Sequence, residues 1–221
     1  MSFWNEFFSK LYIGVLTTLQ LLAVAIPSSI ILGIFIGVLR VYGGKIEKTL
    51  ANLYVHIFRG FPLLVTLMIM FFGLADIGIR LTPYWAAALA IIVCSSAYQS
   101  EYVRMSILSI DEGQSLAARS LGMKRSVEIL YIILPQAFRI AFPGIGNEII
   151  YMILYSSLAY IVGVNEIFSV AISVNSIWFK PTEVFLTTAL IYLAMTTMAS
   201  YGLKKLERKL WIPGFETDVK R

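Results

Sequence analysis

The feature that most constrains this chain is an apolar run near its N-terminus, from about Ile13 to Leu39. A helix needs roughly 20 apolar residues to cross the hydrocarbon core of a bilayer, and this run exceeds that length. A cleaved signal peptide is the alternative, but its apolar core spans only about 7–15 residues and follows a basic segment. Here the run is longer, and a basic cluster follows it, made of Arg40, Lys45 and Lys48. The pattern therefore favours a retained transmembrane helix.

Four further apolar runs have a similar length, and the fourth predicted span is interrupted by Pro143-Gly144-x-Gly146. Thr82 and Pro83 are typical of the cap and first position of a helix, so they open the third span. Composition agrees, because 14% of the residues are charged and 58% are hydrophobic, whereas about a quarter are charged in soluble domains. The sequence predicts an all-α integral membrane protein with five transmembrane helices, at about 13–39, 53–74, 84–108, 137–162 and 181–203.

Lysines and arginines are distributed unevenly about these spans. On one side lie only Lys10, Arg80 and Lys180, while the other fifteen basic residues lie on the opposite side. By the positive-inside rule the basic side is cytoplasmic, so the N-terminus is predicted outside and the C-terminus inside. Residues 1–12 are then an extracytoplasmic segment and residues 209–221 a cytoplasmic tail. The net charge of +5 follows this distribution and does not indicate a nucleic-acid partner.

The stretch from Glu101 to Asn147 is the most polar internal region of the chain. Within it, Asp111 can cap a helix whose third residue, Gln114, can reach back to it, as in a capping box. Gly122 supplies the left-handed residue that commonly closes a helix. The predicted helix, about 111–122, is on the order of 15 Å long and is too short to cross a bilayer. The charge distribution places it in the cytoplasm.

Six motifs occur along the chain in a characteristic order. They are Phe58-Arg59-Gly60-x-Pro62-Leu63-Leu64-Val65, Gly113-Gln114-x-x-Ala117-Ala118-Arg119-x-Leu121-Gly122, Leu134-Pro135-Gln136-Ala137, Gly146-Asn147-Glu148, Ala189-Leu190-Ile191-Tyr192-Leu193 and Leu206-Glu207-Arg208-Lys209. With these motifs the chain resembles the permease subunits of ABC importers, in the polar amino-acid uptake group of binding-protein-dependent transport system inner membrane components. The resemblance implies a type I importer permease with its transmembrane domain at 13–208 and a short cytoplasmic coupling helix.

What the resemblance implies is a transport subunit rather than an enzyme. It would form the pathway of an ATP-driven, binding-protein-dependent importer for amino acids in a prokaryotic inner membrane. The implied partners are ABC ATPase subunits that bind ATP and Mg, a solute-binding protein, a second permease subunit, identical or related, and the lipid bilayer. No cofactor is expected in this chain, whose one Gly-Lys pair, Gly44-Lys45, lacks the other residues of a phosphate loop.

Two other classes remain as alternatives at this point. One is an ion-coupled secondary carrier or channel subunit, and the other is an ABC permease for a different small solute. A secondary carrier commonly shows inverted repeats with mirrored broken helices, and the odd number of predicted spans without such repeats disfavours it. The absence of a predicted pair of acids within the spans disfavours it as well.

The resemblance assigns the ATPase contact to the short polar helix. A solvated charge is the alternative role for Arg119, and Ala117 and Ala118 are predicted to allow close approach of the ATPase. This family usually has glutamate where this chain has Leu116, so docking here should depend more on burial of Leu116 and Leu121. The predicted coupling residues are Gly113, Gln114, Leu116, Ala117, Ala118, Arg119, Leu121 and Gly122.

A substrate pathway is expected near the middle of the membrane, where alternating-access sites lie. Relatives often carry asparagine at position 94 and a Lys-Asp-Thr run at 154–156, and this chain lacks both. Packing between helices is an equal alternative for these small and aromatic residues. The predicted pathway residues are Cys94, Ser95, Tyr98, Tyr151, Tyr155 and Ser156.

Three other features are interpreted from position alone. Pro143, Gly144 and Gly146 are predicted to form a hinge, since proline kinks or breaks a helix. Accommodation of the re-entering chain is an equal alternative for these residues. Glu101 and Arg104 lie three residues apart on one helix face and are predicted to form an ion pair near the cytoplasmic boundary. His56 has no second histidine in the chain, so it is expected at the interface rather than in a metal site.

Overall fold

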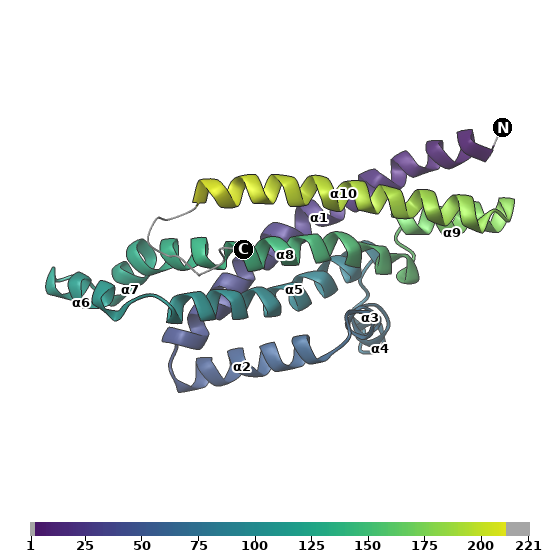
Figure 1. The fold of residues 1–221 in the computed structure, drawn as a ribbon. Coiled ribbons are helices and arrows are strands. Elements are labelled where there is room, and N and C mark those ends of the chain that lie inside the picture. The colour runs from purple at the N-terminus through teal and green to yellow at the C-terminus, as the bar shows by residue number, and fades with distance from the viewer. Residues whose placement is uncertain (1–2, 211–221) are drawn as a thin grey trace.

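A computed structural model describes residues 3–210 of the chain, and these form an elongated helical bundle (Figure 1). Helices α1, α5, α8 and α10 make up the body of the bundle, while α6 projects from one end and α9 lies at the other. The helices are α1 Phe3–Tyr42, α2 Lys45–Gly60, α3 Leu63–Met68, α4 Leu74–Asp76, α5 Pro83–Leu108, α6 Glu112–Ser120, α7 Arg125–Glu128, α8 Leu134–Tyr155, α9 Ile167–Trp178 and α10 Pro181–Leu210. Two π-helical turns, Ile69–Gly73 and Ile129–Ile133, and a 3₁₀ helix, Ser156–Val162, complete the order.

Helix α1 packs closely against α5 because small residues on α1 let the two backbones approach. A Cβ atom added at Gly33 would lie 2.8 Å from the Cβ of Gln99, and one added at Gly37 would lie 2.9 Å from the Cβ of Val103. Glycines four residues apart are typical of helix contacts inside membranes, where burial of apolar surface between helices gives little driving force. The contact fixes α5 in the centre of the bundle.

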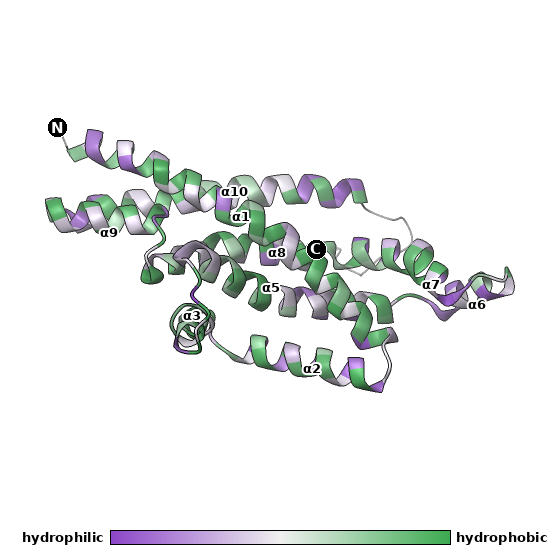
Figure 2. Cartoon of the chain, turned by 180° about the vertical axis from the view of Figure 1, so that it is seen from behind, coloured by the Kyte–Doolittle hydropathy of each residue, from purple (hydrophilic) through white to green (hydrophobic). Residues whose placement is uncertain are grey.

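The all-helical membrane fold agrees with the prediction from sequence, but the five-span count stays a prediction. By length and hydropathy, three helices among residues 3–210 are able to cross a membrane: α1, the continuous helix Arg125–Val162 and α10. The bent pair of α2 and the segment Leu63–Asp76 would be a fourth if it counts as one span. Helix α5 is long enough to cross a membrane, but it is not among these helices. Its buried face contains Ser95, Gln99 and other polar residues, which lower its mean hydropathy. Figure 2 shows hydrophobic residues dominating the bundle, while hydrophilic ones gather on α6 and the C-terminal end of α10.

The second predicted span, 53–74, needs correction because it is not one straight helix. Helix α2 ends at Gly60 and the segment Leu63–Asp76 continues at an angle of 106° to it. In Figure 1, α3 and α4 are seen end-on while α2 lies across the view. The cause is Pro62, which disfavours helical geometry at the residue before it. Accordingly, Phe61 is extended, with φ −87° and ψ 136°.

The interruption predicted within the fourth span, 137–162, is wrong, because α8 passes through Pro143 without a break. The continuous helix Arg125–Val162 covers the whole of this predicted span. Gly144 has a packing role, since a Cβ atom there would lie 2.8 Å from the ring of Tyr102. The helical irregularity lies upstream, in the π-helical turn Ile129–Ile133. A hinge at Pro143, Gly144 and Gly146 stays a prediction, but it no longer rests on a helix break.

The predictions for the two ends of the chain have different outcomes. The predicted extracytoplasmic segment, 1–12, is helical from Phe3 onward as part of α1, and its Phe3, Phe7 and Leu11 pack in a buried cluster with α9. The sequence analysis missed α9, whose 12 residues are too few for a span. Apart from Lys209 and Leu210, the predicted tail 209–221 lies outside the described residues.

Candidate functional site

Helix α6 begins as the sequence predicts, with Asp111 as its cap. The Oδ1 atom of Asp111 accepts a hydrogen bond from the backbone N–H of Gly113 at 2.7 Å. The same geometry explains Gly113, because a Cβ atom there would lie 2.7 Å from that oxygen. The return bond predicted from the Gln114 side chain is not among the hydrogen bonds of residues 3–210. The backbone N–H of Gln114 instead donates to the Asp111 carbonyl at 3.1 Å.

The end of α6 is a Schellman motif around Gly122. Gly122 has φ +75°, as the sequence predicts. The N–H of Met123 donates to the carbonyl of Ala118 at 3.1 Å, and the N–H of Gly122 donates to that of Arg119 at 2.9 Å. These two bonds satisfy carbonyls that the helix end would leave without partners. The short helix is therefore fixed at both ends by its own sequence.

The predicted coupling residues divide into an inward and an outward group. Ala118 is only 1% exposed, so it packs within the chain and cannot form the face that a partner approaches. Ala117 is exposed, and the side chains of Leu116 and Leu121 are 63% and 82% exposed. The outer face of α6 is thus apolar, and the close-approach role predicted for both alanines fits Ala117 alone.

Arg119 forms an ion pair with Glu128 of the same chain. Its Nε atom lies 3.4 Å from Oε2 of Glu128, whose side chain is 2% exposed. The neighbouring Ser115 hydroxyl and the Arg119 guanidinium lower the pKa of Glu128, so this carboxyl stays ionised in the polar loop that carries α6. Arg119 therefore positions α6 against α7, which it contacts, although half of its side chain remains open to a partner.

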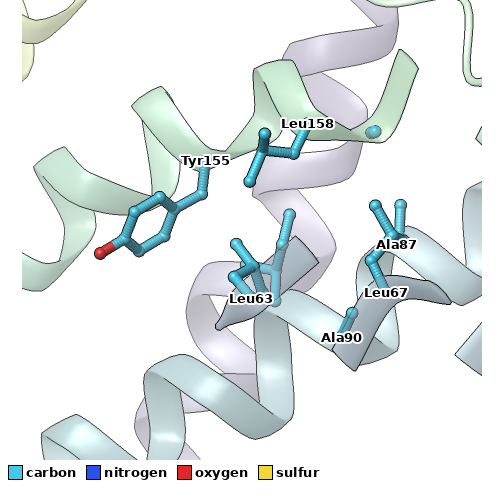
Figure 3. Close-up of a pocket in the computed structure, with 8 residues that line it drawn as sticks. Leu63, Leu67, Ala87, Ala90, Tyr155 and Leu158 are labelled. Carbon is cyan, nitrogen blue, oxygen red and sulfur yellow. The ribbon is translucent and has the colours of Figure 1, made fainter. Parts of the chain in front are cut away.

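The predicted pathway residues come together only in part. Tyr151 and Tyr155 stack with ring centroids 5.9 Å apart. Cys94 and Ser95 are buried on α5, and the hydroxyl of Ser156, at the start of the 3₁₀ helix, donates to the carbonyl of Ile153 in α8. Tyr155 also borders a small cavity of about 10 Å³ against α3 and α5. Figure 3 shows that side chains around it, such as Leu63, Leu67 and Leu158, are apolar.

Sequence reasoning missed Glu148 on α8 as a site residue. Its side chain is 2% exposed and lies beside Ser95 of α5. Within the part of the chain that the structure describes, neither Oε1 of Glu148 nor the Ser95 hydroxyl has a hydrogen-bond partner. An acidic residue inside a membrane span is a functional candidate by default. That signal was present in the sequence, since Glu148 falls inside the predicted fourth span.

A second buried glutamate, Glu166, accepts hydrogen bonds on both oxygens of its carboxylate. Its carboxylate accepts hydrogen bonds from the backbone N–H groups of Phe168 at 2.8 Å and Ser169 at 2.7 Å. The hydroxyl of Tyr192 donates to the same carboxylate at 2.9 Å. Glu166 thus caps the start of α9 and fastens it to α10. The role of Glu166 is structural, whereas Oε1 of Glu148 has no hydrogen-bond partner among the described residues.

The predicted pair of Glu101 with Arg104 is confirmed, and it is part of a larger cluster. Oε1 of Glu101 accepts from Nε of Arg104 at 3.0 Å, and Oε2 lies 2.6 Å from Nη1 of Arg40 and 3.5 Å from Nη1 of Arg59. Arg40 also donates to Asn52 at 2.8 Å. Three arginines therefore surround one carboxylate. His56 is exposed on α2, with Nδ1 2.6 Å from the carbonyl of Asn52.

Comparison with known proteins extends over nearly the whole chain. The family described as "Binding-protein-dependent transport system inner membrane component" matches residues 29–212. The chain is 34% identical to the "Probable glutamine ABC transporter permease protein GlnM" of Bacillus subtilis, covering 92% of this chain and 94% of the relative. It is 32% identical to the glutamine transport system permease protein GlnP of Escherichia coli, covering 90% and 92%.

Solved structures give the same result for the fold. A crystal structure of an amino acid ABC transporter with histidines contains a chain that is 32% identical, with a TM-score of 0.84. The match covers 95% of this chain and 99% of that one. The MetNI methionine ABC transporter in an inward-facing conformation has a TM-score of 0.79 at 21% identity, over 92% and 97% of the two chains. This more distant likeness supports the fold alone.

Proposed function

This chain belongs to the family of binding-protein-dependent transport system inner membrane components, and from that premise we propose how it takes part in amino-acid import. It is a multi-pass membrane permease, a non-enzymatic transport subunit whose ATPase is a separate protein. In the proposal, α5 and α8 line the pathway for the amino acid and α6 transmits the motion of the ATPase. Relatives named for glutamine and arginine make a polar amino acid the first substrate to test.

The observation that carries the coupling role is the outer face of α6. A helix fixed at both ends presents Leu116, Ala117 and Leu121 to the outside, while Ala118 and Arg119 hold it to the rest of the loop. Burying a leucine side chain in a partner contributes about 1.5–3 kcal/mol. The face therefore fits an apolar groove on an ATPase subunit, and ATP and Mg belong to that subunit.

A direct test reconstitutes the permease with its ATPase and solute-binding protein in vesicles. In this assay, Leu121→Asp should abolish the ATP hydrolysis that the loaded binding protein stimulates, because a carboxylate cannot enter an apolar groove. Leu206→Asp is the matched control, since Leu206 is an exposed leucine near the C-terminal end of α10. Unchanged stimulation in Leu121→Asp would show that α6 does not carry the contact.

The pathway is proposed to lie along one face of α5 and α8. Tyr98 and Ser95 on α5 and the stacked Tyr151 and Tyr155 on α8 belong to it, and Glu148 supplies the acidic group that the sequence analysis had not found. Tyr151 and Leu154 are each 43% exposed on the outer side of α8. We propose that a second permease subunit, identical or related, covers this face and completes the pathway.

The proposed orientation places α6 in the cytoplasm and the N-terminus outside. It is supported by the three basic residues on one side of the predicted spans and fifteen on the other. A cysteine introduced at Lys180, beside the 82% exposed Phe179, should react with an impermeant thiol reagent in intact cells. A cysteine at Ser120 of α6 should react only after the membrane is permeabilised. The reverse pattern would invert the orientation.

A further inference from the structure

The break between α2 and α3 places Arg59 in the last turn of α2. Arg59 is the penultimate residue of α2, and Pro62, which has no N–H group, prevents the helix from continuing. The carbonyl of Arg59 accepts a hydrogen bond from the hydroxyl of Tyr98 at 3.4 Å. Tyr98 is one of the residues proposed to line the pathway between α5 and α8. The break therefore places Arg59 next to a pathway residue.

The charge of Arg59 is the least compensated in the cluster around Glu101. Arg40 lies 2.6 Å from Glu101 with 8% of its side chain exposed, and Arg104 makes two bonds to the same carboxylate. Arg59 reaches Glu101 only at 3.5 Å and is 41% exposed. Its guanidinium lies over the Tyr98 ring, 5.2 Å from the centroid. Arg59 is thus held in place while most of its donors remain available.

Arg59 and the buried Glu148 lie near the same face of α5. Ser95, Tyr98 and Tyr102 follow one another at helical spacing on that helix, so they share a face. Glu148 lies beside Ser95, and Arg59 lies over Tyr98, one turn further along the helix. The face thus has a basic group at one level and an acidic group at the next. An amino acid carries the complementary pair, a carboxylate and an ammonium.

We propose that Arg59 binds the carboxylate of the transported amino acid where the pathway passes the break between α2 and α3. The proposal rests on the proposed import function and adds the residue that recognises the carboxylate. A guanidinium binds a carboxylate through two parallel N–H donors, which a lysine cannot reproduce. When no substrate is present, the long contact to Glu101 and the ring of Tyr98 hold Arg59 ready.

The test compares two charge-removing variants in the same cluster, Arg59→Gln and Arg104→Gln. Both remove a positive charge next to Glu101, but only Arg59 lies at the helix break. The wild-type permease, its ATPase and its binding protein are reconstituted in vesicles and supplied with the twenty common amino acids, and the imported ones are identified by mass spectrometry. Import should fall by about ten-fold or more in Arg59→Gln, as expected when a charge-assisted hydrogen bond is lost, and by less than about three-fold in Arg104→Gln.

Two further measurements separate recognition from structural support. Stimulated ATP hydrolysis should persist in Arg59→Gln, and Arg59→Lys should import at a rate between those of Arg59→Gln and the wild type. Import by Arg59→Gln within two-fold of the wild type overturns the inference. So does an equal loss in Arg104→Gln, or loss of stimulated hydrolysis in Arg59→Gln, because either shows that the cluster only holds helices together. Stimulated hydrolysis without import of any amino acid by the wild type overturns the proposed substrate class together with the inference.

Discussion

The end of the molecule that carries α6 and the interior between α5 and α8 are organised in opposite ways. At α6, the cap by Asp111 and the closure by Gly122 join residues that are close in sequence. In the interior, Glu148 lies beside Ser95, a residue from another helix and more than fifty positions away. The comparison shows that a local motif specifies its own geometry, whereas a polar site inside a bundle depends on how separate helices pack.

The prediction with the largest expected effect concerns the inward and outward faces of α6. Ala118→Trp should lower the free energy of unfolding of the isolated permease by about 1–3 kcal/mol, because Ala118 is 1% exposed and the larger side chain has no room. Ala117→Trp should change that stability by less than about 0.5 kcal/mol, because position 117 is exposed. Thermal unfolding in detergent measures both variants.

Both tryptophan variants should lose stimulated ATP hydrolysis, but for different reasons. Ala117→Trp keeps a stable permease and places a bulky group where the ATPase approaches, so co-purification of the ATPase should fail. Ala118→Trp disturbs the loop itself. Equal stability of the two isolated variants would contradict the division of α6 into two faces.

The second prediction concerns the interior and compares the two buried glutamates. Glu148→Gln should reduce amino-acid import by about ten-fold while stability and stimulated hydrolysis persist, because its Oε1 has no partner to lose among the described residues. Glu166→Gln should mainly lower the melting temperature, because it removes charge from a carboxylate that accepts three hydrogen bonds. Vesicle import and thermal unfolding distinguish the two. Normal import in Glu148→Gln would remove this acid from the pathway.

The third prediction applies to the local motif at the end of α6. A Cβ atom at Gly122 meets no atom within 4 Å, so Gly122→Ala is strained only by its backbone, with φ at +75°. The cost should be about 1–2 kcal/mol of local helix stability, seen as faster hydrogen exchange in α6 than in the wild type. Gly122→Asn is the control, since asparagine tolerates this conformation better. Equal exchange in both variants and the wild type would show that the Schellman motif is not what fixes the helix end.

The same contrast explains how much of the molecule the sequence predicts. The all-helical membrane fold, α6 and its caps were predictable because hydropathy and capping act over neighbouring residues. The sequence prediction missed the break at Pro62 because the apolar run continues across it, although Pro62 and Gly60, two residues before it, are present in the sequence. The inward turn of Ala118 and the convergence of Arg40 and Arg59 on Glu101 depend on tertiary packing. Residue spacing alone does not contain that information.

The smallest expected effect concerns Leu116, a position where the family resemblance implies glutamate. Because the side chain is 63% exposed, Leu116→Glu should leave the stability of the isolated permease unchanged within about 0.5 kcal/mol. Its neighbours on the outer face, Ala117 and Leu121, are apolar and exposed, so we expect a partner groove that favours leucine. Stimulated ATP hydrolysis should therefore fall several-fold, less than in Ala117→Trp, because one apolar contact is lost while the shape of the helix is kept.

Leu116→Met is the matched control for this last variant, since methionine keeps an apolar side chain of similar volume and should retain stimulation. An increase in stimulation by Leu116→Glu would mean that a basic group of the ATPase faces this position. The coupling face would then recognise charge as well as apolar surface. In that case Arg119, whose side chain is 57% exposed beside Glu128, would be the next residue of α6 to test for a charged contact with the partner.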